Sequence, residues 1–453
     1  MTDHANQQAT PRSTPLRGSR ADTALPDERP LASRPVRVVV VAAFDSQLKW
    51  SAGICHELER RGAVVEVLAP RGRTGLSERQ LDDVGLPAVR TADWDDVLEA
   101  ASTADVVVCA LLGPEIRRLT VGLEQRGLRP GPVVVAGWVG LILERITAGY
   151  LDRCGADVVA VNARHELEHF RFAAQRLTIP DDNLVLTGLP FLSPRPQPQR
   201  TGPVRTVLFA DQPTIPSGPG DRVYLYRRLV QHARRHPDRE VLLKPRHRLG
   251  EDTIHRMHHH PEQLLADEDL PPNFRIVHDP IPELLPRTDL LLTVSSTACL
   301  EAVDAGCRVA FVLDLGVHER LGNHVFLESG LLRTFDQVDD DDLGVPSPEW
   351  VDSYFGGRTA PAVATIVDRV EKLLASGERP SRLVRSSPYF RAATELELAR
   401  ASGTLTRSPS AWARRRHRYG SVRGTIVHAG SQLLPPVLMR PIRHLYRRAL
   451  GRA

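Results

Sequence analysis

The stretch TVSSTACLEAVDAGCRVAFVL, residues 293–313, predicts the end of a strand, a short helix and a second strand. It begins within the apolar run DLLLTV (289–294), and Gly306 stands where a helix predicted over 297–305 would have its C-cap. The apolar run RVAFVL (308–313) follows at once. Continuous apolar strands joined by a helix are typical of a parallel sheet that is covered on both faces.

The same alternation extends in both directions along the chain. In the second half, further apolar strands are predicted at 206–210, 239–244 and 273–277. In the first half they are predicted at 36–44, 63–69, 104–112, 132–140 and 156–162. Strands that alternate with helices in this way predict an α/β protein with two doubly wound domains.

The segment LPFLSPRPQPQRTGP (189–203) separates the two halves. Its five prolines and one glycine exclude a continuous helix or strand. We therefore predict five parts: a disordered extension at 1–34, a first domain at 35–190, a linker at 191–203, a second domain with closing helices at 204–400 and a basic tail at 401–453.

The net charge of +4 combines two regions of opposite charge. Residues 401–453 contain 11 arginines and no acidic residue, whereas the first 400 residues contain 48 basic and 55 acidic ones. Basic and apolar residues mix in 402–453, which suits either a solvated tail or a peripheral contact with anionic lipid. Aromatic residues make up only 5% of the chain, so a stacking surface for nucleic acid is disfavoured.

The sequence disfavours both a membrane span and secretion. No run reaches 18 consecutive apolar residues, and residues 1–34 lack the apolar segment of a secretory signal. The five cysteines form no CxxC pair and mostly lie in apolar runs, as expected in a reducing compartment. We therefore expect a cytoplasmic protein, located at the inner face of the cell membrane if its tail binds lipid.

Polar side chains cluster after the strands of the second half, where parallel sheets bind ligands. Ser295, Ser296 and Thr297 precede the helix of the quoted stretch, whose N-terminal N–H groups attract an anion. Glu301 lies one to two turns into that helix and suits the two hydroxyl donors of a ribose. Phosphate plus ribose indicates a nucleotide, and a capped helix with one surface glutamate is the alternative interpretation.

The segment EVLLKPRHR (240–248) places basic side chains after another strand of the second half. Lys244 is one of only three lysines in the chain, and its ammonium suits a diphosphate, as does the guanidinium of Arg246. His247 is suited to donate to a phosphate or to protonate a leaving oxygen. A solvated basic loop is the alternative, but the serine-containing helix start in the same domain favours a binding site.

Other nucleotide and metal motifs are missing from the sequence. The absence of GxGxxG after the first strand and of GxxxxGK[ST] disfavours a dinucleotide oxidoreductase and a P-loop enzyme. The histidines at 258–260 are interpreted as a surface loop and residues 339–342 as a solvated acidic loop, and no metal site or cofactor is predicted. In the first half, Asp45 and His165 follow strands and are candidates for a catalytic base, although Asp45 equally suits a helix cap.

These features together resemble the GT-B glycosyltransferases over about residues 36–400. Within that group, the sequence is similar to bacterial capsule and teichoic-acid-type transferases, such as CDP-glycerol glycerophosphotransferases and polysialyltransferases. Lys244-Pro245-Arg246-His247 matches part of their K-x-H-P element, with Arg248 in place of the proline, and Ser295-Ser296 matches their S-S/T element. The layout also resembles uncharacterised glycosyltransferases of high-GC bacteria.

The resemblance implies two Rossmann-like domains that face each other across a cleft, and a glycosyltransferase that needs no metal or cofactor. Its donor would be a nucleotide-activated sugar held by the second domain, with Glu301 on the ribose. Its acceptor would be a cell-envelope glycan, a polysaccharide or a lipid-linked molecule. A non-hydrolysing nucleotide-sugar epimerase and a non-catalytic nucleotide-sugar-binding protein are the alternatives.

Overall fold

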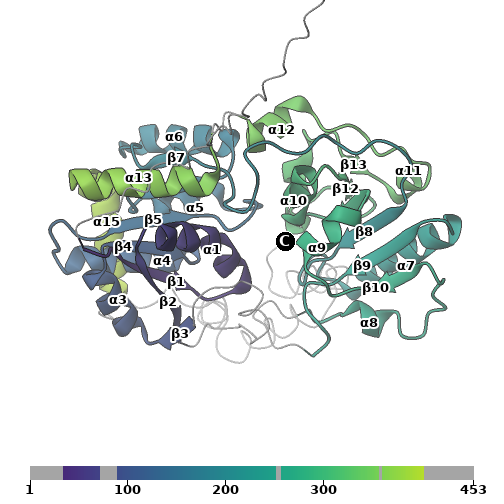
Figure 1. The fold of residues 1–453 in the computed structure, drawn as a ribbon, viewed down its shortest axis with the longest axis horizontal. Coiled ribbons are helices and arrows are strands. Elements are labelled where there is room, and N and C mark those ends of the chain that lie inside the picture. Colours follow the sequence, from purple (N-terminus) through teal and green to yellow (C-terminus); the bar gives the residue numbers. More distant parts are fainter. Residues whose placement is uncertain (1–33, 72–88, 251–256, 357–359, 402–453) are drawn as a thin grey trace, which may run out of the picture.

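The computed structural model describes residues 34–71, 89–250, 257–356 and 360–401. The extension predicted at 1–34, apart from Arg34, and the tail predicted at 401–453, apart from Ala401, lie outside these residues. Within them, two parallel sheets stand side by side, each with helices packed around it (Figure 1). None of the described helices is both long and apolar enough to cross a bilayer.

The first domain is built on a seven-stranded sheet in the order β3-β2-β1-β4-β5-β6-β7. All pairs are parallel, and valine-rich central strands are buried on both faces. The strands are β1 (Arg37–Ala42), β2 (Val64–Pro70), β3 (Val89–Ala92), β4 (Val106–Ala110), β5 (Val133–Gly137), β6 (Val158–Val161) and β7 (Leu184–Leu186). The helices are α1 (Asp45–Arg60), α3 (Trp94–Thr103), α4 (Gly113–Gln125), α5 (Ile146–Arg153) and α6 (Arg164–Leu177).

The second domain repeats this arrangement with a six-stranded parallel sheet in the order β10-β9-β8-β11-β12-β13. Its strands are β8 (Thr206–Ala210), β9 (Glu240–Lys244), β10 (Phe274–Ile276), β11 (Leu290–Thr293), β12 (Arg308–Val312) and β13 (Leu332–Arg333). Its helices are α7 (Pro219–Arg235), α8 (Pro261–Leu264), α9 (Ile281–Leu284), α10 (Ala298–Asp304), α11 (Phe335–Asp339) and α12 (Pro348–Phe355), with 3-10 turns at Leu285–Arg287, Glu319–Leu321 and Asn323–Phe326.

Both sheets place their carboxyl ends on the same cleft. Strand order reverses beside β1 in the first sheet and beside β8 in the second, and such reversal points are where doubly wound sheets bind ligands. One continuous cluster of buried apolar side chains runs from Trp50 of α1 to Phe311 of β12, so the domains share part of their core. The predicted fold class, two doubly wound α/β domains that face each other across a cleft, is confirmed.

The last helices of the described chain return to the first domain. They are α13 (Ala362–Ser376), α14 (Pro380–Ser386) and α15 (Pro388–Ala401), and α13 lies along the first domain in Figure 1. Arg61, the C-cap residue of α1, forms ion pairs with Asp368 and Glu371 of α13, and Phe390 is buried in the core of the first domain. The region predicted as one domain at 204–400 therefore divides in space, because the apolar face of α13 is buried against α1 and the first sheet.

Candidate functional site

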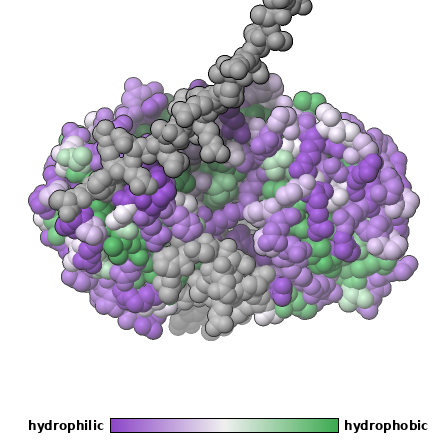
Figure 2. All heavy atoms as spheres, in the orientation of Figure 1, coloured by the Kyte–Doolittle hydropathy of each residue, from purple (hydrophilic) through white to green (hydrophobic). Residues whose placement is uncertain are grey.

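A cavity of about 430 Å³ lies in the cleft between the two domains. Figure 2 shows this side of the molecule hollowed between its two halves. The first domain and linker line it with Asp45, Ser46, Lys49, Ala52, Val139 and Phe191. The second domain lines it with Ala210–Pro213, Lys244, Arg246, His278, Pro280–Pro282, Ser296–Ala298 and Glu301. The volume falls within the usual range for small-molecule sites.

Helix α1 supplies the polar side chains of the first domain. The helix starts directly after β1, and Gln47 folds back so that its Oε1 accepts a hydrogen bond of 2.7 Å from the N–H of Ala43. Asp45 lies in the first turn, where a carboxylate is favoured by the helix dipole. Lys49 follows one turn later, at i+4, so both side chains project from the same helix face into the cavity.

Two ion pairs connect the domains across this cavity. Asp45 accepts hydrogen bonds of 2.8 Å at each carboxylate oxygen from Nη2 of Arg246. The ammonium of Lys49 lies 2.7 Å from a carboxylate oxygen of Glu301 and 4.5 Å from the ring centre of Phe191. Two of the predicted second-domain residues, Arg246 and Glu301, are therefore paired with side chains of α1.

The pair with Arg246 determines the ionisation of Asp45. Burial raises the pKa of Asp45, but the charge of Arg246 and its hydrogen bonds, the N–H of Ser46 and the nearby His247 together bring that pKa below its ordinary value. Asp45 is therefore ionised at neutral pH. An ionised carboxylate can accept a proton, but the paired guanidinium keeps it a weak base.

The start of α10 places only part of the predicted phosphate group at the cavity. Ser296 and Thr297 line it, and the N–H of Leu141 in the first domain donates to Oγ1 of Thr297 over 3.2 Å. Ser295 is instead 1% exposed, and its hydroxyl donates to the carbonyl of Leu321 over 2.6 Å. Ser295 thus fixes the loop that precedes the helix, which differs from the phosphate contact that we predicted.

The two predicted catalytic histidines are not among the side chains that line the cavity. His247 is 4% exposed, because the turn after Lys244 directs it into the domain, where its carbonyl accepts a hydrogen bond from His260. His165 lies at the start of α6, and its Nδ1 is 2.6 Å from the hydroxyl of Ser353 in α12. His165 therefore links two helices, and neither histidine lies on the wall of the cavity.

Several cavity residues were missed as site residues by the sequence reasoning. Asp211 lines the cavity, yet its carboxylate is 3.0 Å from Nη1 of Arg222 and accepts a hydrogen bond of 2.6 Å from Tyr226. Burial raises the pKa of Asp211, and these two partners from α7 oppose that shift. The position of Asp211 directly after a strand was the available signal, whereas Lys49 could have been found from its i+4 spacing to Asp45.

A protein-family model matches the part of the chain that contains this whole site. The family model described as "Putative glycosyltransferase (DUF6716)" matches residues 38–373, which include both sheets and every residue that lines the cavity. The chain belongs to this family. Family membership supports glycosyl transfer as the general activity, and the two facing doubly wound domains are the GT-B architecture. A search of curated proteins found no significant match.

Solved structures with a similar arrangement include transferases and an epimerase. MurG of Acinetobacter baumannii is 16% identical, with 75% of this chain and 100% of that chain covered and a TM-score of 0.47. The UDP-GlcNAc 2-epimerase of Neisseria meningitidis, bound to UDP-GlcNAc, is 12% identical, with coverages of 74% and 100% and a TM-score of 0.45. The calicheamicin glycosyltransferase CalG4 is 16% identical, with coverages of 83% and 100% and a TM-score of 0.41.

Proposed function

We propose that this member of the DUF6716 family transfers a sugar from a nucleotide-activated donor to an acceptor hydroxyl in the interdomain cavity. One observation carries the proposal. Lys244 at the end of β9 and Arg246 beyond it line the same cavity as Ser296, Thr297 and Glu301 at α10. Cations, hydroxyls and the carboxylate of Glu301 around a single space match the phosphates and the ribose of a nucleotide.

The donor diphosphate belongs between the end of β9 and the start of α10. Lys244 offers a compact ammonium and Arg246 a planar guanidinium, both of which bind phosphate oxygens. Ser296 and Thr297 add hydroxyls to the lining of the same cavity. When the sugar is transferred, negative charge grows on the departing diphosphate, and fixed cations stabilise that charge without a metal ion.

The ribose belongs at Glu301. The carboxylate of Glu301 forms an ion pair with Lys49 at 2.7 Å, and the side chain of Glu301 is only 13% exposed. A ribose diol offers two O–H donors that can take the place of the ammonium. Pro280, Ile281 and Pro282 form a neighbouring wall with apolar atoms, which suits the flat face of a nucleobase.

Binding of the donor would also activate Asp45. A phosphate that pairs with Arg246 removes the partner that lowers the pKa of Asp45, so the pKa of this carboxylate rises and it becomes a stronger base. Asp45 then accepts the proton of the acceptor hydroxyl as the new glycosidic bond forms and the diphosphate leaves. The acceptor would enter from the first domain, and the similarity to capsule and teichoic-acid-type transferases favours a cell-envelope glycan or a lipid-linked acceptor.

A thermal-shift screen of the full chain tests donor binding. UDP-, GDP-, CMP-, CDP- and dTDP-sugars are added one at a time, and at least one should raise the melting temperature, because a ligand that binds only the folded state stabilises it. Glu301→Gln and Ser296→Ala should then weaken binding about tenfold each, since each removes one polar contact of roughly 1.4 kcal/mol. A lack of response to every nucleotide, or unchanged affinity in both variants, would refute the assignment.

Product analysis with a radiolabelled donor tests the reaction itself. Label that appears in an acceptor, with release of the free nucleotide, supports transfer. Label that stays on the nucleotide in an altered sugar would instead identify an epimerase, and binding without turnover in the presence of cell-envelope acceptors would favour a binding protein.

A further inference from the structure

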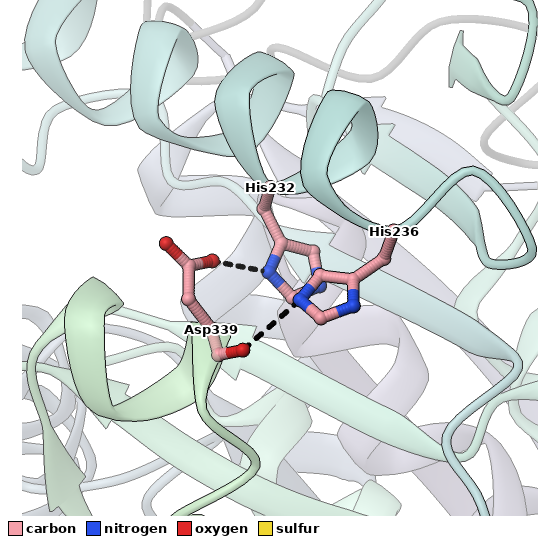
Figure 3. Close-up of side chains that lie close together, drawn as sticks. All are labelled: His232, His236 and Asp339. Carbon is pink, nitrogen blue, oxygen red and sulfur yellow. Dashed lines mark hydrogen bonds and ion pairs between the residues drawn. The ribbon is translucent and has the colours of Figure 1, made fainter.

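Two groups of ionisable side chains outside the cavity differ in how their charges are balanced. In the second domain, His232 and His236 of α7 lie against Asp339 of α11 (Figure 3). Nδ1 of His232 is 2.6 Å from a carboxylate oxygen of Asp339, and Nε2 of His236 is 3.0 Å from the backbone carbonyl of Asp339. At the end of the same helix, Arg235 pairs with Asp340. The basic groups of this first group therefore interact with acidic partners of the protein itself.

The second group surrounds a small hollow in the first domain and carries an excess of positive charge. The hollow lies at the amino ends of the strands, on the edge of the sheet opposite the cleft, because Gly131 and Pro132 directly precede β5 and line it. Its charged lining residues are four arginines and one glutamate, namely Arg129, Arg379, Arg382, Arg385 and Glu124. Four positive charges against one negative charge give this lining a net charge of +3.

Arg379 is held in place at the hollow by backbone carbonyl groups. Its Nε donates to the carbonyl of Gly131 over 2.9 Å, and its Nη1 donates to the carbonyls of Leu373 and Glu378 over 2.9 and 2.7 Å. Its Nη2 makes no hydrogen bond among the described residues. A guanidinium that is fixed in this way offers its remaining N–H groups in a set direction, so an anion that binds them loses less of its affinity to ordering of the side chain.

Three neighbours of Arg379 offer further donors to the hollow. The side chain of Arg382 is exposed and forms no hydrogen bond or ion pair within the described part of the chain, and its charge disfavours that of Arg379. Ser381 is 1% exposed, and its hydroxyl likewise has no partner among the residues that the structure describes. Arg129 is exposed, with its Nη2 3.8 Å from Glu124. An anion at this position would therefore reach donors that the described protein groups leave largely unused.

The charge of the hollow matches that of a phosphate dianion. Arg385 already pairs with Glu124 at 3.1 Å. Asp157 is buried beside the lining, where its Oδ1 accepts a hydrogen bond of 3.1 Å from the N–H of Ser381. Adding the negative charge of Asp157 to the lining leaves +2, which a phosphate group with a charge near −2 balances. Guanidiniums also suit phosphate in shape, because their paired N–H groups bind two of its oxygens at once.

We propose that this hollow binds one phosphate group, which is held by Arg129, Arg379 and Arg382 together with the hydroxyl of Ser381. The hollow has a volume of about 20 Å³, so one phosphate oxygen enters it while the rest of the group stays at its mouth beside the exposed arginines. The bound group would fasten α14 to the loop before β5. Free phosphate and the headgroup of an anionic lipid share this chemistry. The proposal is independent of the proposed transfer reaction, since the cleft lies at the other edge of the sheet.

Chemical labelling of arginine in the full-length protein tests the site. Phenylglyoxal reacts with accessible guanidiniums, and mass spectrometry of the peptides reports each arginine separately, so phosphate that binds in the cleft does not obscure the result. Inorganic phosphate should slow the labelling of Arg382 severalfold relative to NaCl at the same ionic strength. Arg235 is the internal reference, because it is exposed and pairs with Asp340, and its labelling should be the same in both salts.

Two matched variants show whether the arginines of the hollow act together. Arg129→Gln should raise the phosphate concentration that half-protects Arg382 about fivefold, because one exposed guanidinium is removed, whereas Arg235→Gln should leave it unchanged. Both side chains are more than half exposed, so neither substitution disturbs the core. Equal labelling of Arg382 in phosphate and NaCl, or unchanged protection in Arg129→Gln, would overturn the proposal.

Vesicles of phosphatidylcholine with and without phosphatidic acid identify the source of the phosphate group. Protection of Arg382 by phosphatidic acid at a lower phosphate concentration than inorganic phosphate requires would support a lipid headgroup as the ligand. Protection by inorganic phosphate alone would support a soluble phosphate. If neither protects Arg382, the hollow is not a phosphate site and the proposal is wrong.

Discussion

The two sheets share their strand order but differ in what their carboxyl ends present to the cleft. In the first sheet, β1, β4, β5 and β6 end in small or apolar residues, namely Ala42, Ala110, Gly137 and Val161. In the second sheet, β9 ends in Lys244, and Asp211 directly follows β8. The first domain supplies its charges from α1 instead. The same topology therefore presents a densely charged side and a sparser one, which match the donor and acceptor sides that we propose.

The largest expected effect concerns the buried ion pair between Arg222 and Asp211, at the carboxyl end of β8 in the second sheet. Arg222 and Asp211 are each about 1% exposed, and Arg222→Met would leave Asp211 buried without its counter-charge. Such a loss destabilises a protein by about 3–5 kcal/mol. Chemical denaturation should show this decrease, whereas Arg246→Met, which breaks the more exposed pair with Asp45, should lower stability by no more than about 1 kcal/mol. Equal losses of stability in Arg222→Met and Arg246→Met would contradict the contrast between the buried pair and the more exposed one.

The next effect should appear in catalysis. Lys244→Ala removes an ammonium from the proposed diphosphate site, and the rate of sugar transfer should fall about 10²–10³-fold, as when one fixed stabilising donor is removed from an active site. Lys372→Ala is the control, because Lys372 is exposed on α13 in the first domain. Initial rates with a saturating donor give the comparison. If Lys244→Ala keeps a rate within threefold of that of the unmodified protein, the proposed diphosphate site in the second domain is contradicted.

Asp45 is the charged side chain of the first domain to which we assign proton transfer. Asp45→Asn should reduce kcat about 100-fold, the lower end of the effect of a general base. In the unliganded protein Arg246 holds the pKa of Asp45 low, so the acid limb of kcat/KM should fall at low pH. In the proposed complex the donor phosphate pairs with Arg246 and that pKa rises, so the acid limb of kcat should lie at a higher pH. If the acid limbs of kcat and kcat/KM lie at the same pH, donor binding does not change the pKa of Asp45 and this prediction is wrong.

The smallest effect should come from a buried carboxyl of the first domain. Burial raises the pKa of Glu166 to about 8, although the N–H groups of Ala163 and Asn162 oppose the shift. The folded protein therefore prefers the protonated form, and this preference contributes stability below pH 4.5 that is lost as the pH rises through 8. Glu166→Gln should flatten the decline in stability between about pH 4.5 and 8, because glutamine has no proton to lose in this range. Denaturation at three pH values measures this, and an unchanged pH profile would contradict the raised pKa.

The sequence predicts the second domain well because its signals are local. The helix predicted at 297–305 is observed at Ala298–Asp304, and Lys244 does end a buried strand beside the cavity. The ion pair between Lys49 and Glu301 could not be predicted, since it joins residues 252 positions apart and depends on how the domains pack. The acidic loop at 339–342 was interpreted as solvated, and Asp340, Asp341 and Asp342 are exposed, but the side chain of Asp339 is buried beside α7.

The return of α13 to the first domain has a consequence for synthesis on the ribosome. Ile366, Val367 and Val370 complete a core that begins with β1, yet they are translated after every strand of the second sheet. Part of the apolar surface of the first domain therefore stays uncovered while the second domain is synthesised. We therefore expect the first domain to complete its core only after α13 has been synthesised, and a nascent chain that stops before α13 to expose an apolar surface that chaperones recognise.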